Sequence, residues 1–314
     1  MTPALVRPPQ REVRSQIFDS ARWAAYLPRA DDILIATYPK CGTTWTQRIV
    51  GMLLAGSAAP RPLHAQWFDF RLRGSMEETA AEAEAVVGRR HIKTHLPYDA
   101  LPLYEGLKII HVARDGRDSA MSLHNHLFNF TPTMNEVMDQ VSLADPKFGE
   151  RVAPTPADPA VFFHGWLEDG GARGDPGASY WEVERSYWAR RSDANMLLTH
   201  YADMKADLAA EVRRIAEFLE IGLAAETMAE IVAAARFETM REQGAQLMPG
   251  AENAWNGGSQ RFLYKGVNGR WKDVLTAEDL AAYEAKVKFE FSPSQAAWLE
   301  HGRLMAGDPE RAAA

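Results

Sequence analysis

Residues 37–45 have the sequence TYPKCGTTW and directly follow an apolar run. Gly42 allows a ligand to approach the backbone closely. Thr43 and Thr44 offer hydroxyl and N–H groups at the start of an amphipathic helical pattern, where the helix dipole favours negative charge. Lys40 adds a positive charge that can reach the same anion. The stretch therefore predicts a strand, a loop and a helix that together bind an anion, although Lys40 precedes Gly42, unlike the lysine of the generic nucleotide-binding loop.

Strand and helix patterns alternate along the chain. The predicted strands are short apolar or β-branched runs at residues 33–36, 90–93, 108–112 and 195–198. Helical patterns include residues 43–55 and 204–220. No repeat or linker divides the sequence, so we expect one α/β domain over residues 1–314, with a mainly parallel central sheet flanked by helices. Ligands of such sheets bind beyond the C-terminal ends of the strands.

Composition limits the classes of function. The formal net charge is −7, which argues against a nucleic-acid-binding protein with a general basic surface. The single cysteine excludes an intramolecular disulfide framework, and no Cys/His cluster has the spacing of a zinc site. No apolar run is long enough to span a bilayer. We therefore expect a cytoplasmic, metal-free protein that holds an anionic ligand by local Lys and Arg side chains.

Residues 145–179 are rich in proline and glycine, with a short aromatic group at 162–166 between the two halves. Long irregular segments in compact domains are often lids or binding loops. We predict a mobile cover over the acceptor site here.

The complete loop sequence resembles the 5′-phosphosulfate-binding loop of the cytosolic-type sulfotransferases, whose usual form is TYPKSGTTW. The resemblance implies the P-loop-kinase-like sulfotransferase fold and a sulfuryl donor, 3′-phosphoadenosine 5′-phosphosulfate (PAPS), which leaves as 3′-phosphoadenosine 5′-phosphate (PAP). This chain has Cys41 where the family usually has Ser. The implied donor-binding residues of the loop are Lys40, Cys41, Gly42, Thr43, Thr44 and Trp45.

Two further segments are similar to the family's 3′-phosphate site. Residues 108–122, KIIHVARDGRDSAMS, supply Arg114 and Ser122 at the matching positions, and an Arg can bind a phosphate through two hydrogen bonds. Residues 265–272, KGVNGRWK, supply Lys265 and Gly266.

The second of these segments departs from the family's RKGxxGDWK pattern at two positions. Tyr264 stands where the family has Arg, and Arg270 stands where it has Asp. We expect Arg261 to replace the missing Arg.

Two smaller agreements concern the adenine. Tyr201 lies in YADMK, which resembles the family's YEDMK, and Phe237 is positioned to stack on the base opposite Trp45. Ala235 lacks the hydroxyl of the Thr that the family has there. The matches keep the family's order over roughly residues 30 to 290.

The segment KTHLP, residues 93–97, resembles the motif in which the family's catalytic His takes the proton of the acceptor hydroxyl. We assign His95 as the general base, because an imidazole accepts a proton near neutral pH. Lys40 is expected to stabilise the bridging oxygen of the donor, and Lys93 the transferring sulfuryl group. His91 is a weaker alternative base, deeper in the apolar run.

The acceptor pocket is predicted to be aromatic, which favours a small aromatic or hydrophobic hydroxyl compound. Ordinary core packing is the alternative role of each candidate side chain. The candidates are Trp67, Phe68, Phe128, Phe130, Phe163 and Trp166.

Two other functions remain open at this stage. A small-molecule P-loop kinase would need a Mg²⁺ carboxylate at a strand end, and Asp115 is the only plausible one. A non-catalytic nucleotide-binding relative would fit the departures at Cys41, Ala235 and Tyr264. The oligomeric state is also open, because the family's KxxxTVxxxE dimer element keeps only its Lys and Thr.

Overall fold

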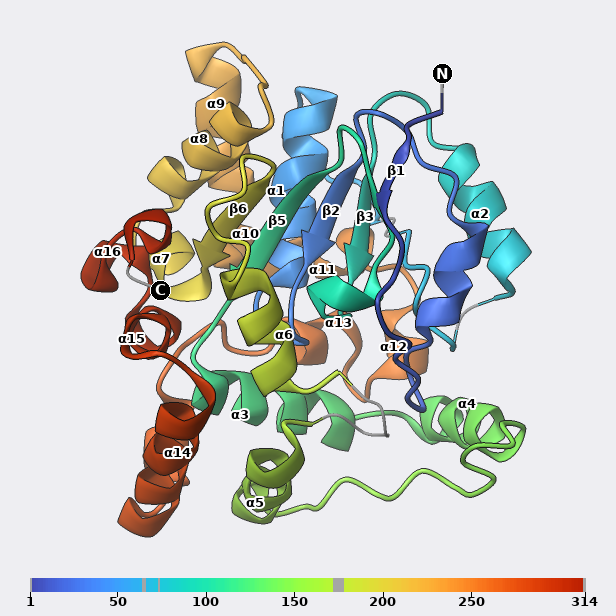
Figure 1. The fold of residues 1–314 in the computed structure, drawn as a ribbon, viewed down its shortest axis with the longest axis vertical. Coiled ribbons are helices and arrows are strands. Elements are labelled where there is room, and N and C mark those ends of the chain that lie inside the picture. Colours follow the sequence, from blue (N-terminus) through green and yellow to red (C-terminus); the bar gives the residue numbers. More distant parts are fainter. Residues whose placement is uncertain (1, 64–65, 73, 172–177, 313–314) are drawn as a thin grey trace.

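The centre of the molecule is a four-stranded parallel sheet. The computed structural model describes residues 2–63, 66–72, 74–171 and 178–312. The strands are β2 (Ile33–Ala36), β3 (His91–Thr94), β5 (Lys108–Ala113) and β6 (Met196–His200), in the order β3-β2-β5-β6 (Figure 1). The four predicted strands are confirmed, with boundaries that differ by no more than two residues.

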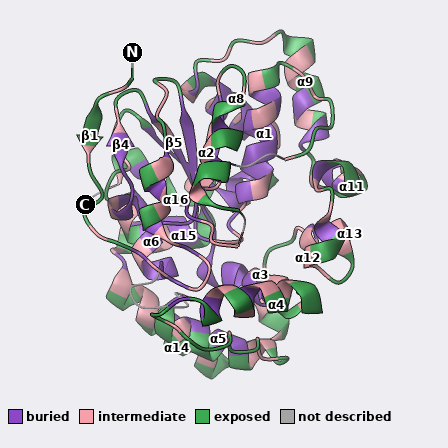
Figure 2. Cartoon of the chain, turned by 90° about the vertical axis from the view of Figure 1, so that its right-hand side faces the viewer, coloured by how far each residue is buried: buried purple, intermediate pink, exposed green. Residues whose placement is uncertain are grey.

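Both faces of this sheet are buried, as near-continuous apolar strands require. Successive side chains point to opposite faces. Ile33 and Ile35 share a core cluster with α1 (Thr43–Ala55), α8 (Leu208–Phe218) and α9 (Ala225–Ala234). Leu34 and Ala36 share the other cluster with α6 (Tyr180–Trp188). The helices therefore cover the sheet on two sides, and the strands and the inner side of α1 are buried (Figure 2).

The remaining elements extend this layered core, with α3, α4 and α5 beyond one end of the sheet (Figure 1). Their bounds, with η for a 3₁₀-helix, are β1 (Leu5–Arg7), η1 (Ser20–Ala25), α2 (Met76–Glu84), η2 (Tyr98–Ala100), β4 (Leu103–Tyr104), α3 (Gly116–Phe128), α4 (Pro132–Leu143), α5 (Pro159–Asp169), α7 (Tyr201–Ala206), α10 (Phe237–Glu242), α11 (Gly244–Leu247), α12 (Ala251–Ala254), α13 (Gly258–Phe262), η3 (Arg270–Asp273), α14 (Ala277–Glu290), α15 (Pro293–His301), α16 (Arg303–Ala306) and η4 (Pro309–Arg311).

The predicted helix over residues 204–220 is two helices. Its first part belongs to α7, and α8 begins after Asp207. Asp207 has non-helical backbone angles, with φ of -144° and ψ of 80°, and its side chain accepts a hydrogen bond from the N–H of Ala210. An Asp at an N-cap stabilises the start of a new helix rather than the continuation of the old one, which explains the break.

Part of the segment 145–179 is helical. Its aromatic group lies in α5, where Phe162, Phe163 and Trp166 are buried. Asp158 caps the helix and a proline occupies its first turn, a combination that favours helix initiation. Residues 172–177, which the prediction of a mobile cover includes, lie outside the described residues.

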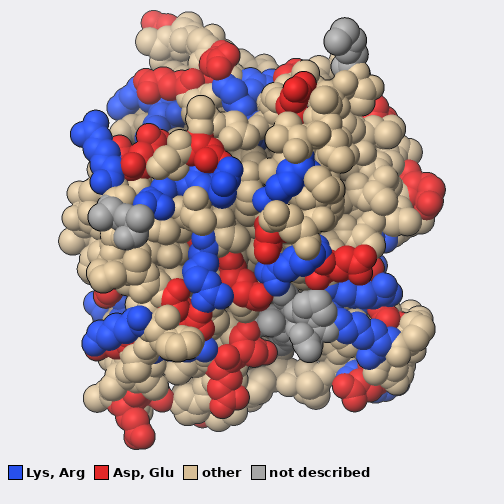
Figure 3. Space-filling view, in the orientation of Figure 1, with Lys and Arg blue, Asp and Glu red and all other residues tan. Residues whose placement is uncertain are grey.

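Two properties of the described chain bear on the excluded functions. No helix in the described ranges is long and apolar enough to cross a membrane. On the face drawn in Figure 3, Lys and Arg side chains are interspersed with Asp and Glu among the described residues. That face is therefore not the broad basic surface that non-specific nucleic-acid binding uses.

Candidate functional site

The residues that directly follow the four parallel strands meet at one edge of the sheet. The loop after β2, His95 after β3, Arg114 after β5 and Tyr201 after β6 all line one cavity, whose volume is about 700 Å³. Helices α3 and α4 and the segment from α11 to Arg270 supply much of the rest of its wall. The cavity thus lies where ligands bind in open parallel sheets.

The loop after β2 presents the N-terminus of α1 to this cavity. Gly42 is the N-cap residue and has a left-handed φ of 119°, which favours glycine. A Cβ at Gly42 would also lie 3.2 Å from the ring of Tyr201. Gly42 has no side chain to bond the first-turn N–H groups of α1, and Thr43 and Thr44 line the cavity. The helix start can therefore bind an anion with its N–H groups.

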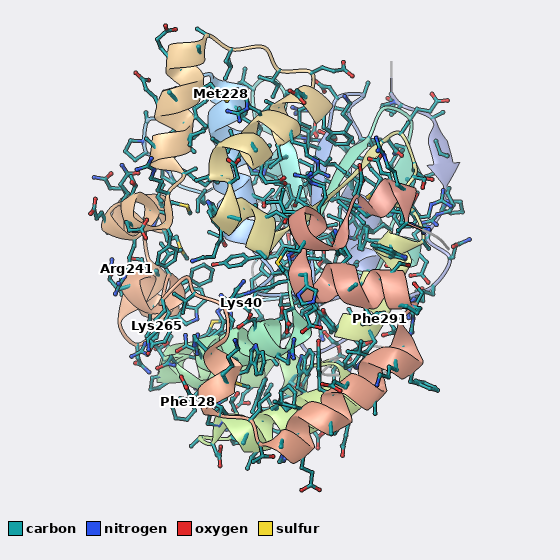
Figure 4. All side chains as sticks on the ribbon, turned by 90° about the vertical axis from the view of Figure 1, so that its left-hand side faces the viewer. Lys40, Phe128, Met228, Arg241, Lys265 and Phe291 are labelled. Atoms are coloured by element: carbon teal, nitrogen blue, oxygen red, sulfur yellow. The ribbon has the colours of Figure 1, made fainter. Side chains whose placement is uncertain are left out.

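The charge of the cavity wall is one-sided. Among the described lining residues there are five cations and no Asp or Glu. The cations are Lys40, Lys93, Arg114, Lys265 and Arg270. Figure 4 shows Lys40 and Lys265 on the same side of the molecule. A cavity lined by one sign of charge concentrates the opposite sign, so it is suited to a ligand with several negative charges.

Lys40 has an unusual environment for a lysine. Removal from water lowers its pKa to about 7, and the positive charges of Arg114 and Lys93 add to this effect. Its Nζ lies 3.4 Å from His126 Nδ1 and 4.0 Å from the ring centroid of Phe262. Because an opposite charge favours the charged form, a bound anion would restore the full charge of Lys40.

Arg114 connects three segments around the cavity. Its guanidinium donates to Asn268 Oδ1 at 2.7 Å, to Val267 O at 3.1 Å and to Lys40 O at 3.3 Å. It also lies 4.1 Å from the ring centroid of Tyr201. These contacts hold the guanidinium at the cavity wall and join the loop after β2 to the segment that follows α13.

The hydrogen bonds of His95 determine its tautomer. Nδ1 lies 2.8 Å from the carbonyl oxygen of Thr37, and a carbonyl oxygen only accepts, so Nδ1 carries the proton and Nε2 the lone pair. The rings of Phe18 and Trp67 pack against the imidazole at 5.6 and 5.1 Å. Burial, followed by the charge of Lys93, lowers the pKa of His95 to about 3. Without a ligand His95 is therefore a neutral imidazole with its lone pair on Nε2, a weaker base than a free imidazole, and an anion bound beside Lys93 would raise its pKa again.

Lys93 lies between the sheet edge and an aromatic stack. Its Nζ is 3.8 Å from the ring centroid of Trp67, and Trp67 is stacked on Phe70 at 4.0 Å. The indole N–H of Trp67 donates to Asp69 Oδ2 at 2.9 Å. The position of Lys93 is thus set by a ring that is itself fixed by stacking and by a hydrogen bond.

The predicted adenine residues cluster on another part of the wall. The indole N–H of Trp45 donates to Ala235 O at 2.7 Å, and its ring packs edge-on against Tyr201 at 5.4 Å. Phe237 also lines the cavity. A Cβ at Gly266 would lie 2.6 Å from the Phe237 ring, so glycine is needed there for the chain to pass that ring.

Two predicted donor residues differ in how they reach the site. Ser122 on α3 lines the cavity. Cys41 is fully buried, and its Sγ lies 3.2 Å from Ser119 Oγ. Burial raises the pKa of the Cys41 thiol. The thiol points into the core beside α3, so residue 41 can serve a ligand only through its backbone.

Two arginines lie beside Tyr264, which stands where the family has Arg. The guanidinium carbons of Arg261 and Arg270 lie 5.2 and 5.1 Å from the ring centroid of Tyr264. Of these two, Arg270 is the one that lines the cavity. Arg270, which stands where the family has Asp, thus places a guanidinium at the cavity wall, and Arg261 is not among the described lining residues.

Of the six aromatic residues predicted for the acceptor pocket, Trp67 and Phe130 line the cavity. Phe68 is instead buried against Trp23 and Tyr26, at 5.3 and 5.4 Å. Trp67 and Phe68 lie in a turn in which the N–H of Phe70 donates to Trp67 O, and in this turn Trp67 faces the cavity while Phe68 faces the core.

Three other acceptor candidates also lie away from the cavity. Phe128 is 48% exposed and stacks on His124 at 5.6 Å. Phe163 and Trp166 stack on each other inside the core, and the indole N–H of Trp166 donates to the hydroxyl of Tyr38 at 2.8 Å. The two α5 residues therefore hold the helix in place rather than line the pocket.

Several residues of the apolar wall were not predicted. Met134 and Met138 are four residues apart on α4, and His126 is four residues after Ser122 on α3. This spacing places the members of each pair on one helix face, a signal that was available in the sequence. The other unpredicted apolar residues include Ile17, Phe18, Phe70, Leu72, Trp255 and Phe262.

His91, the alternative base, and Asp115, the alternative metal ligand, have surroundings that differ from those of His95. The Nε2 of His91 lies beside Gly51 of α1, 3.7 Å from where a Cβ would be. Burial, followed by Lys93, lowers the pKa of His91 to about 4. Asp115 caps α3 and pairs with the Arg117 guanidinium at 2.6 Å. Its carboxylate is thus already neutralised by an arginine.

Comparisons with known proteins agree with this geometry. The sulfotransferase domain family matches residues 30–295. The glycolipid sulfotransferase of Mycobacterium bovis is 31% identical over 312 residues, covering 92% of this chain and 94% of that protein.

Two solved structures have a similar fold. A mouse sulfotransferase complexed with PAP gives a TM-score of 0.61 at 22% identity, covering 85% of this chain and 86% of that chain. Retinol dehydratase in a complex with retinol and PAP gives a TM-score of 0.62 at 22% identity, covering 88% of this chain and 87% of that chain. The strand-end site, the family match over most of the chain and the similarity to the mycobacterial enzyme lead to one conclusion: the chain belongs to the sulfotransferase family.

Proposed function

We propose that this protein transfers the sulfuryl group of PAPS to a hydroxyl of an uncharged, hydrophobic acceptor, with His95 as the general base. The observation that carries the proposal is the cavity at the strand ends. It combines five cations and no described carboxylate with a neutral imidazole whose Nε2 can accept a proton. A donor with two phosphate groups and a sulfate suits such a wall.

The donor is proposed to bind with its 5′-phosphosulfate on the loop after β2. The N–H groups of Thr43 and Thr44, at the start of α1, would hold the phosphate. The 3′-phosphate would be bound by Arg114, Ser122 and Lys265, and by Arg270 in addition.

The proposed adenine contacts are aromatic. Trp45, Tyr201 and Phe237 all line the cavity and offer rings on which a base can stack. That both structural neighbours cited above are PAP complexes supports the choice of donor.

In the proposed reaction the acceptor oxygen attacks sulfur in line with the bridging S–O bond. A new S–O bond forms, the bridging bond breaks, and PAP leaves with the electron pair. His95 Nε2 takes the proton of the acceptor hydroxyl. Lys40 stabilises the charge that develops on the bridging oxygen, and Lys93 the sulfuryl oxygens.

The acceptor is proposed to be uncharged because the described wall offers no counterion for an ammonium group. The wall near His95 is apolar: Phe18, Trp67 and Phe70 surround the imidazole and the Lys93 stem. Met134 and Met138 add flexible thioether side chains that adapt to different shapes. The names of two similar proteins, a glycolipid sulfotransferase and a retinol complex, point to the same class of acceptor.

The test is calorimetric titration with PAP, without metal, on the wild type and on Arg114→Ala. We expect micromolar binding that Arg114→Ala weakens tenfold or more, about 1.4 kcal/mol. Absence of wild-type binding would refute the proposed donor.

A parallel titration with Mg²⁺ and ATP examines the kinase alternative. ATP binding that is tighter than PAP binding and that depends on Mg²⁺ would favour the kinase. PAP binding without sulfuryl transfer to any acceptor would favour the non-catalytic relative.

A further inference from the structure

One cavity residue has a partner that the proposed chemistry does not yet use. His126 lies on α3, four residues after Ser122, and faces the cavity from the same side of the helix. Its Nδ1 is 3.4 Å from Nζ of Lys40. When Lys40 is protonated, its ammonium group only donates, so the contact then requires the lone pair of His126 on Nδ1.

Aromatic rings fix the imidazole that makes this contact. Phe130, Trp255 and Phe262 pack around His126, with ring centroids 5.2, 5.0 and 5.6 Å away. The same Phe262 ring lies 4.0 Å from Nζ of Lys40, close enough for a cation–π attraction. Lys40 therefore has a hydrogen-bond acceptor and an aromatic face on the same side of its ammonium group.

Lys40 needs such a partner because its other neighbours repel it. Arg114 and Lys93 are both positive and both lower its pKa. A lysine side chain with four rotatable bonds would otherwise turn away from these charges, and ordering it costs rotamer entropy. Lys40 also has a φ of 70°, a conformation that is uncommon for residues other than glycine, so the loop already directs its side chain.

We propose that His126 is the positioning residue for Lys40: its Nδ1, with the ring of Phe262, holds the ammonium group at the cavity wall where the phosphosulfate of the donor would bind. The importance of this position for transfer rests on the function proposed above. The contact itself is a property of the protein alone.

The first test therefore uses the protein without ligand. Lys40 is labelled with a trace of deuterated acetic anhydride at pH 7, and its acetylation rate is measured by mass spectrometry in four proteins: wild type, His126→Phe, His126→Asn and His124→Phe. Phe keeps a ring but no acceptor, whereas Asn Oδ1 replaces Nδ1. His124 is the matched control, because its Nε2 bonds Pro156 O and its ring stacks on Phe128.

We expect His126→Phe to raise the acetylation rate of Lys40 at least threefold, because the amine loses its acceptor. His126→Asn and His124→Phe should stay within about twofold of wild type. An unchanged rate in His126→Phe, or an equal rise in His126→Asn, would overturn the proposal.

A double-mutant cycle then asks whether His126 acts through Lys40. We expect His126→Phe to weaken PAP binding three- to tenfold in the wild type and to have no further effect in Lys40→Met. An equal loss in both backgrounds would mean that His126 acts on its own and would overturn the positioning role. If wild type binds no PAP, the proposed function fails, while the labelling rates still decide the contact.

Discussion

The two ends of the cavity are built in different ways. The donor end is built around residues that follow the parallel strands, such as Lys40, His95 and Arg114, and the segment after α13 completes it. The side chains of His95 and Arg114 are held by hydrogen bonds to backbone carbonyl oxygens. The acceptor end consists of side chains from helices and loops, such as Phe130, Met138 and Trp255. The donor end is therefore fixed by the sheet, and the acceptor end by packing between segments.

This difference implies two levels of tolerance to substitution. A change at a strand end removes a charge or a proton acceptor that no neighbour can move to replace, since the sheet holds each residue in place. A change in the apolar wall alters shape, and flexible side chains such as Met138 can adjust. Substitutions should therefore affect the donor end strongly and the acceptor end mildly.

The largest effect is expected at His95. His95→Ala removes the proposed base and should lower turnover by about 10² to 10⁴. Turnover is measured with PAPS and the best acceptor from a panel of phenols and long-chain alcohols. The PAP affinity of the variant should remain within about threefold of wild type, which checks that the cavity is intact.

His91→Ala is the matched control on the same strand. It should keep turnover within a few-fold of wild type, because His91 packs beside α1. If His95→Ala stays active while His91→Ala is inactive, the assignment of the base is wrong.

The next effect concerns the two arginines beside Tyr264. Arg270→Ala should weaken PAP binding about tenfold, because a guanidinium bond to a phosphate is charge-assisted. Arg261→Ala should leave it within about twofold, since Arg261 is not among the described lining residues. Equal losses in calorimetric titrations of the two variants would argue against the assignment of Arg270.

A smaller effect is expected at the acceptor end. Phe130→Ala should raise KM for a hydrophobic acceptor about fivefold, through lost apolar contact, and weaken PAP binding by no more than about threefold, the part that acts through its packing on His126. Phe128→Ala is the control, because its side chain stacks on His124 outside the cavity. A similar rise in KM for both variants would show that the wall is misassigned.

The smallest effect is on stability: replacing Lys40 should make the folded protein more stable, whereas most substitutions make a protein less stable. The pKa of Lys40 is lowered from 10.5 to about 7 in the folded protein, so the unfolded chain binds the extra proton over that range and stability falls as pH falls from 10.5 to 7. Lys40→Met removes this cost and should raise Tm at pH 7 by about 2–4 °C. The gain should shrink as pH approaches 10.5, which calorimetric scans can follow. A lower Tm of Lys40→Met than of wild type at pH 7 would contradict this prediction.

The sequence was most informative where local rules decide the structure. Loop residues such as Gly42 are adjacent to a strand and a helix in the chain, and the parallel sheet then brings the ends of distant strands together. For that reason the strands, the loop and the positions of His95 and Arg114 could be predicted.

The acceptor wall could not be predicted in the same way. Whether an aromatic side chain lines a cavity depends on tertiary packing, as the opposite directions of Trp67 and Phe68 illustrate. The helix α5 is a different case, since its signals were present: Asp158 before a proline at the start, and Gly170 with a left-handed φ at the end.

The hydrogen bonds of Arg114 to Val267 and Asn268 have a consequence for synthesis of the protein. Ribosomes make the loop at residues 37–45 more than 200 residues before the segment that brings Lys265 and Arg270 to the same cavity. A chain that stops near residue 260 would carry the loop motif without Lys265 and Arg270. During translation, capture of the donor therefore has to wait until synthesis has passed residue 270.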